Sequence, residues 1–154
     1  MSAAHVSTAA DRLARILETA PRRLVDLSED EVSHIPAPGR WSKKQVLGHL
    51  IDSAANNHQR LVRTRIAGSL DFPNYDQESW VAIQPYAAEP WPDLVNLWLL
   101  FNRHLLHLIR AVPPSDLSLT CIIGGREPIP LSALIDGYMD HLEHHLAGIM
   151  ADRP

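Results

Sequence analysis

Near its C-terminus the chain reads Met139-Asp140-His141-Leu142-Glu143-His144-His145. This stretch lies in an apolar pattern of helical period, which predicts a helix from near Pro130 to about Met150. His141 and His145 are four residues apart, so a helix places both imidazoles on one side, one turn from each other. The predicted core face, which contains or borders these two histidines, is formed by Leu131, Leu134, Ile135, Tyr138, Leu142, Leu146 and Ile149.

Three other segments show the same helical period. They run from about residue 8 to 27, from 42 to about 67, and from about 92 to 111. Pro21 lies inside the first segment and is expected to kink or split that helix, because proline removes a helical hydrogen bond. Four helices of this kind predict an all-α four-helix bundle, and the length of 154 residues predicts a single domain over residues 1–154.

Short polar motifs and turn residues mark the ends of these helices. Ser42 and Gln45 have the spacing of a capping box, and so do Ser28 and Glu31, where a brief helical turn is expected. Gly68 marks the end of the second long helix.

The connections include one long crossover and one predicted hairpin. Residues 71–90 form the crossover, with a short helix around 76–83, and a connection of this length is often functional. Residues 119–131 resemble a small β-hairpin before the last helix, because Gly124-Gly125 permits the positive dihedral angles of a two-residue turn.

Composition narrows the class of protein. The net charge of −4 and the pI of about 6.1 give no sign of nucleic-acid binding or of attraction to an anionic membrane. Cys121 is the single cysteine, which excludes an internal disulfide and a cysteine-rich zinc site. No signal peptide or membrane-spanning run is recognised, so a cytoplasmic location is expected. The HExxH, G-x-S-x-G, P-loop and dinucleotide-binding motifs are absent.

The two spaced histidines suggest a metal site. Imidazole nitrogens bind zinc, nickel, iron or copper, and His49 is the best candidate for a third ligand. His49 joins the other two only if the helices that carry them are neighbours, which spacing alone does not decide. The alternative is that these are core histidines with ordinary hydrogen-bond partners.

A polar stripe accompanies His49 along its helix, formed by Asp52 or Ser53, then Asn56 and Arg60. Asp52 lies one turn past His49, so it is a candidate to orient a metal ligand or to bind substrate, or it is a solvated carboxylate. Asn56 and Arg60 are candidates to hold a substrate carboxylate, or they belong to a solvated face. On a helical wheel, Glu143 points away from His145, so Glu143 is not proposed as a general base.

Two motifs together carry a family resemblance. Trp41-Ser42-x-x-x-Val46-Leu47-x-His49-Leu50-x-Asp52, with His141-x-x-x-His145-x-x-x-Ile149 far downstream, resembles the DinB/YfiT-like superfamily. The crossover motif Tyr75-x-x-x-x-Trp80 and the chain length resemble its YfiT-like branch. The resemblance implies a four-helix bundle in which His49, His141 and His145 bind one divalent transition metal, with zinc or nickel favoured over iron or manganese. Gln45 departs from the pattern, since many relatives carry glutamate there.

The resemblance also implies an activity. Members of this superfamily resemble transferases that join a low-molecular-weight thiol, such as bacillithiol or mycothiol, to a small electrophile, and others are described as metal-dependent hydrolases. The partners implied are therefore a small thiol and an electrophile, with a homodimer as the assembly. Two alternatives stay open: a non-enzymatic metal- or ligand-binding bundle of a stress response, and a purely structural bundle that binds no metal.

Overall fold

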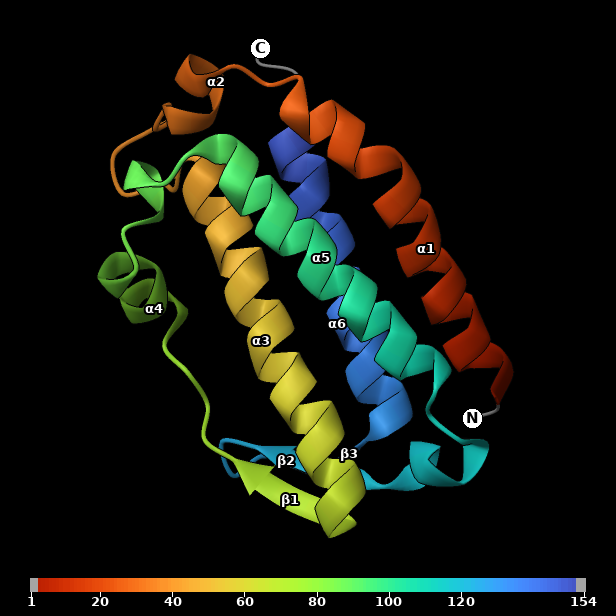
Figure 1. The fold of residues 1–154 in the computed structure, drawn as a ribbon. Helices are drawn as coiled ribbons and strands as arrows, with labels where there is room; N and C mark the ends of the chain where they lie inside the picture. The colour runs from red at the N-terminus through yellow and green to blue at the C-terminus, as the bar shows by residue number, and fades with distance from the viewer. Residues whose placement is uncertain (1–2, 152–154) are drawn as a thin grey trace.

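A computed structural model describes the backbone of residues 3–151 and the side chains of residues 8–151. Four long helices form the bundle shown in Figure 1: α1 (Ala3–Val25), α3 (Lys43–Ala67), α5 (Trp91–Arg110) and α6 (Leu131–Met150). α1 and α3 each pack against both α5 and α6. The predicted four-helix bundle is therefore confirmed, and α3 and α6, which carry the three histidines, are neighbours.

The centre of the bundle is filled by large side chains from all four helices. Leu13, Leu50, Trp98 and Leu142 are completely buried, and each such residue contributes about 1.5–3 kcal/mol of hydrophobic stabilisation. α1 begins before the predicted start at residue 8 and continues through Pro21 to Val25, so the helix is not split. Among the described residues, none of the helices combines the length and the apolar character that crossing a bilayer requires.

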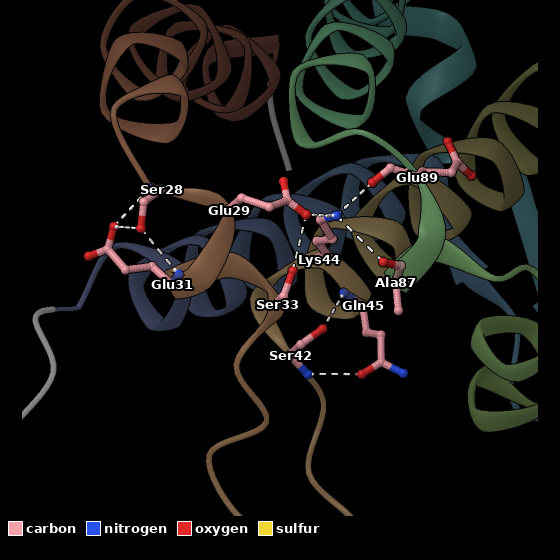
Figure 2. Close-up of polar contacts among 9 residues, drawn as sticks. All are labelled: Ser28, Glu29, Glu31, Ser33, Ser42, Lys44, Gln45, Ala87 and Glu89. Atoms are coloured by element: carbon pink, nitrogen blue, oxygen red, sulfur yellow. Dashed lines mark hydrogen bonds and ion pairs between the residues drawn. The ribbon is translucent and has the colours of Figure 1, made fainter.

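Both predicted capping boxes are present. Ser42 caps α3, where its hydroxyl accepts the Gln45 amide and the Gln45 side chain accepts the Ser42 amide. Ser28 caps the short helix α2 (Glu29–Ser33) in the same way with Glu31, as Figure 2 shows. α3 ends at Gly68, whose φ of 81° is a left-handed value that glycine adopts readily.

A three-stranded sheet closes one end of the bundle (Figure 1). β2 (Thr120–Ile123) and β3 (Ile129–Pro130) are antiparallel, and the turn between them has positive φ at Gly124 and Gly125, so the predicted hairpin is confirmed. β1 (Ser69–Phe72) pairs parallel to β2. This strand was not predicted, because its alternation of polar and apolar residues covers only four positions and its partner is about 50 residues away in the chain.

The crossover runs back along α3 from the sheet end and contains α4 (Gln77–Ile83) and the 3₁₀ turn η1 (Tyr86–Ala88). Lys44 fastens it to the bundle, as Figure 2 shows. The Lys44 side chain is only 3% exposed, and its ammonium group binds the Glu29 carboxylate and donates to the carbonyl oxygens of Glu89 (2.7 Å) and Ala87 (3.5 Å). One buried cation thus joins α2, α3 and the crossover.

Candidate metal centre

Three histidines meet between α3 and α6. His49 Nε2 lies 2.9 Å from His141 Nε2. The ring centroids of His49 and His145 are 4.9 Å apart, and those of His141 and His145 are 4.6 Å apart. One ring nitrogen from each histidine can be chosen so that all three lie within 4.8 Å of one another. The helix pairing therefore brings together the three residues that the sequence singled out.

The arrangement suits a small divalent cation. In a tetrahedral site with metal–nitrogen bonds of 2.0–2.1 Å, two ligand nitrogens are about 3.3 Å apart. The 2.9 Å between His49 Nε2 and His141 Nε2 is close to this value, and the three histidines each offer a ring nitrogen within 4.8 Å of the others. His49 is 1% exposed, whereas His141 and His145 are half-buried. The α3 histidine of the cluster is therefore buried, and the two α6 histidines are partly accessible to solvent.

Burial keeps the imidazoles neutral. Desolvation, together with the neighbouring histidines, lowers the pKa of His49 to about 4 and that of His141 to about 4. Desolvation also lowers the pKa of His145, and His144 adds to this effect. Since metal ions bind the neutral imidazole, the cluster is in its binding form at neutral pH.

Residues around the cluster fix two of the rings. Trp41 packs on His49, with ring centroids 5.1 Å apart. The Ser53 hydroxyl lies 3.4 Å from His141 Nδ1, which leaves Nε2 facing His49. His49 Nδ1 is buried and has no hydrogen-bond partner among the described residues. Such contacts hold imidazoles in a defined orientation, as the outer shell of a metal site does.

Asp52 connects the neighbourhood of His49 to the crossover. It is 2% exposed, so it is not a solvated carboxylate. Its Oδ1 accepts hydrogen bonds from the Tyr86 hydroxyl (2.6 Å) and the Gln84 amide (2.8 Å), whereas Oδ2 has no partner among the described residues. Desolvation raises the pKa of Asp52, and these two hydrogen bonds oppose the rise. No hydrogen bond joins Asp52 to His49 within the described side chains, so a role in orienting the ligand stays a prediction.

A cleft of about 250 Å³ adjoins the cluster. His49 and His141 lie on its wall, and Asn57, Arg60 and Tyr75 also line it. Arg60 is 8% exposed and therefore does not belong to a solvated face. Asn56 is not among the described lining residues, and its side-chain amide donates instead to the Asp52 carbonyl oxygen at 2.9 Å.

Other charged, thiol and histidine side chains are not part of the cluster, although His144 packs on His145 with ring centroids 5.1 Å apart. Arg12 of α1 binds both carboxylate oxygens of Glu143, at 2.9 and 2.6 Å, and also contacts Asp140 at 2.7 Å. Glu143 is thus a structural partner between helices. His144 is exposed. Cys121 is fully buried in β2, where desolvation raises the pKa of its thiol, so it is a poor nucleophile. A separate group on the surface of α3 and α5 contains His58, His104 and His107.

Asn57 was not selected from the sequence, and Ser53 was named only as the alternative to Asp52 in the polar stripe. At 100° per residue, Ser53 and Asn57 fall on one side of His49, and Asp52 and Asn56 fall on the other. The structure turns the first pair toward α6 and Asp52 toward the crossover. The exact i, i+4, i+8 spacing of His49, Ser53 and Asn57 is the signal that favours the first pair.

The fold and the cluster together define a four-helix-bundle protein with one histidine on its second long helix and a spaced pair on its last, an arrangement that suits a metal ion. The chain belongs to the DinB superfamily, whose family model matches residues 12–149. This confirms the family resemblance drawn from the two histidine motifs.

Similar proteins agree with this assignment. The chain is 28% identical over 137 residues to a protein of Oceanobacillus iheyensis, covering 86% of this chain and 79% of the relative. It is 30% identical over 152 residues to a protein of Geobacillus thermodenitrificans, covering 90% and 79%. Both relatives carry the name "Putative metal-dependent hydrolase".

One solved structure shares the fold. It is YfiT from Bacillus subtilis, described as "a probable metal-dependent hydrolase with an unusual four-helix bundle topology". The TM-score is 0.80 at 18% sequence identity, and the match covers 97% of this chain and 86% of YfiT.

Proposed function

We propose that this chain is a divalent-metal-dependent enzyme whose metal is held by His49, His141 and His145. The observation that carries the proposal is the convergence of these three neutral imidazoles, two of which, His49 and His141, lie on the wall of a cleft. The names of the two relatives, which call them metal-dependent hydrolases, support the same chemistry. Zinc and nickel are the metals that this ligand set favours, with iron or manganese as further candidates.

Each protein group has a separate task in this proposal. Three neutral ligands leave the full charge on a divalent cation, which lowers the pKa of a water or thiol that it binds. Trp41 packs on the His49 ring and restricts its orientation. Ser53 holds His141 through Nδ1, so that Nε2 faces the site. The cleft beside His141 admits the second reactant.

Hydrolysis and thiol transfer use the same centre and differ in the nucleophile. We propose hydrolysis first, because both relatives carry that name. Thiol transfer is the second candidate. The described lining of the cleft offers Ser53, Tyr75 and Tyr138 rather than a carboxylate as a general base. A thiol whose pKa is lowered by the metal requires no such base, because the thiolate is already the nucleophile.

Metal analysis tests the proposal. Untagged protein, purified without a metal column, should contain about one equivalent of metal by plasma mass spectrometry. His141→Ala should lose the metal. His144→Ala is the matched control, since it removes an exposed histidine of the same helix and should retain the metal. If wild type binds no zinc, nickel or manganese after soaking, the proposal is wrong.

Turnover separates an enzyme from a non-enzymatic metal-binding bundle. Protein that retains its metal should be assayed for hydrolysis of small esters and amides and for conjugation of bacillithiol or mycothiol to electrophiles. Activity that is lost in His49→Ala and kept in His144→Ala, with unchanged circular dichroism, supports catalysis. Tight metal binding without turnover in either assay supports the binding bundle.

A further inference from the structure

Arg60 is a buried cation without an anionic partner. Arg60 is only 8% exposed. Within residues 8–151, no carboxylate lies within ion-pair distance of its guanidinium group. Its recorded contact is with the ring of Tyr75, whose centroid lies 5.8 Å from the guanidinium carbon. Tyr75 and Cys121 are the titratable groups that face it, and burial raises the pKa of both, so neither carries a negative charge at neutral pH.

Other cations of this chain show what a structural role looks like. Lys44 is also buried, and it has the Glu29 carboxylate and two carbonyl oxygens as partners (Figure 2). Arg12 is paired with Asp140 and Glu143, and Arg65 is paired with Asp116 at 2.8 Å. A buried charge normally requires such partners. Arg60 therefore departs from the pattern at the position where the cleft lies.

The position of Arg60 relates it to the histidine cluster. His49 and Arg60 are eleven residues apart on α3, which is about 16 Å along the helix axis and about 20° in rotation. Both side chains line the same cleft. Helical side chains lean toward the helix N-terminus, so the long Arg60 side chain extends in the direction of His49. The cleft thus has the cluster at one end and a guanidinium toward the other.

We infer that the cleft binds a small carboxylate substrate, whose carboxylate pairs with Arg60 while its reacting group faces the histidine cluster. The placement of the reacting group at the histidine cluster rests on the proposed function, whereas the binding of the carboxylate by Arg60 does not. The planar guanidinium matches a carboxylate through two parallel hydrogen bonds. The described lining contains one charged side chain, and its apolar part, with Ile129 and Leu134, suits a short hydrocarbon segment. The cleft volume of about 250 Å³ lies below the range of sites for drug-sized ligands, so the cleft fits only a small molecule.

The test uses butyrate as the carboxylate, butyramide as its neutral counterpart, and inorganic phosphate. Binding to the protein as purified is followed by chemical-shift titration of the α3 backbone amides. Butyrate should bind, butyramide should bind at least about tenfold more weakly, and Arg60→Gln should weaken butyrate at least about tenfold. Arg60→Lys should fall between, because the charge remains and the planar fork is lost.

Arg63→Gln is the matched control. Arg63 is an exposed arginine of the same helix that lies over the Phe72 ring at 5.6 Å, so the variant makes the same change of charge outside the cleft. It should leave butyrate binding unchanged. The inference is overturned if butyramide or phosphate binds as well as butyrate, if Arg63→Gln weakens butyrate as much as Arg60→Gln does, or if folded Arg60→Lys and Arg60→Gln both bind like wild type.

Metal content is measured on the same samples. A protein that contains metal but does not bind butyrate through Arg60 contradicts this inference alone. A protein that contains no metal but binds butyrate through Arg60 contradicts the proposed function and leaves the carboxylate site standing.

Discussion

The ring of Tyr86 lies directly against the backbone of Gly48. A Cβ atom at position 48 would be 2.2 Å from a carbon of that ring, a distance that real contacts do not allow. This close approach lets the Tyr86 hydroxyl reach Asp52 at 2.6 Å. Gly48 immediately precedes His49 in α3, so the glycine docks the crossover beside the candidate metal centre.

Gly48→Ala should therefore destabilise the protein, although alanine is the better helix former. The gain in helix propensity is about 1 kcal/mol, whereas forcing an extra carbon into a packed contact costs about 1–3 kcal/mol, and displacement of Tyr86 also removes a buried hydrogen bond from Asp52. Thermal unfolding measures the difference. Gly148→Ala is the control, because nothing lies within 4 Å of the added Cβ, and it should raise stability slightly. A Gly48→Ala variant as stable as Gly148→Ala would contradict the close contact.

Lys44 offers a second test of how the crossover is held. Lys44→Met keeps the hydrocarbon stem but removes the ammonium group, which leaves the Glu29 carboxylate and the partly buried carbonyl oxygens of Ala87 and Glu89 without this donor. Leaving such groups unpaired costs about 1–3 kcal/mol, so the midpoint of urea unfolding should fall. Lys43→Met changes the neighbouring lysine, which makes only an exposed contact with the Ala151 carbonyl oxygen at 3.4 Å, and should stay within about 0.5 kcal/mol of wild type. Equal effects of the two variants would contradict the anchoring role.

The long helices and the histidine pair were predictable because they depend on local spacing. An i, i+4 pair lies on one side of any helix, and the capping boxes at Ser28 and Ser42 mark helix starts within a few residues. The sequence left open whether Pro21 kinks the first helix or splits it. α1 continues through Pro21, because packing of residues such as Leu24 after the proline outweighs the lost hydrogen bond.

Contacts between distant segments were outside the reach of sequence patterns. The meeting of His49 with His141 spans 92 residues, and the strand β1 pairs with a segment about 50 residues away. The burial of Arg60 and Asp52 likewise depends on which side of α3 the crossover and α6 cover. A helical wheel gives the direction of each side chain but not its neighbour, so the choice between a solvated face and a cleft required the structure.

Trp41 should report metal binding. Its ring centroid lies 5.1 Å from that of His49, and paramagnetic ions such as nickel and cobalt quench tryptophan at this range. Adding nickel to metal-free protein should decrease the fluorescence, and Trp41→Phe should lose most of the decrease while still binding nickel by mass spectrometry. Trp80→Phe is the control, because Trp80 packs on Tyr75 in the crossover. Quenching that is unchanged in Trp41→Phe and lost in Trp80→Phe would place the ion elsewhere.

The buried histidines predict the pH dependence of the metal-free protein. The folded pKa values of His49 and His141 are about 4, below the ordinary value of 6.5. Between these values the unfolded chain binds more protons than the folded one, so stability must fall as pH decreases from about 6.5 to about 4. A shift of this size corresponds to about 3 kcal/mol per histidine as an upper limit.

Urea unfolding of metal-free protein at pH 7, 6, 5 and 4 measures this loss. Carboxylates paired in the folded state also contribute to it, so the comparison with His49→Gln isolates the histidine part. The variant has one fewer buried imidazole and should lose less stability over the same interval. Zinc should steepen the dependence in wild type, because protons and metal compete for the same ring nitrogens. If His49→Gln loses as much stability as wild type between pH 7 and 4, the His49 imidazole does not resist protonation in the folded protein, and a desolvated neutral cluster is the wrong description of the site.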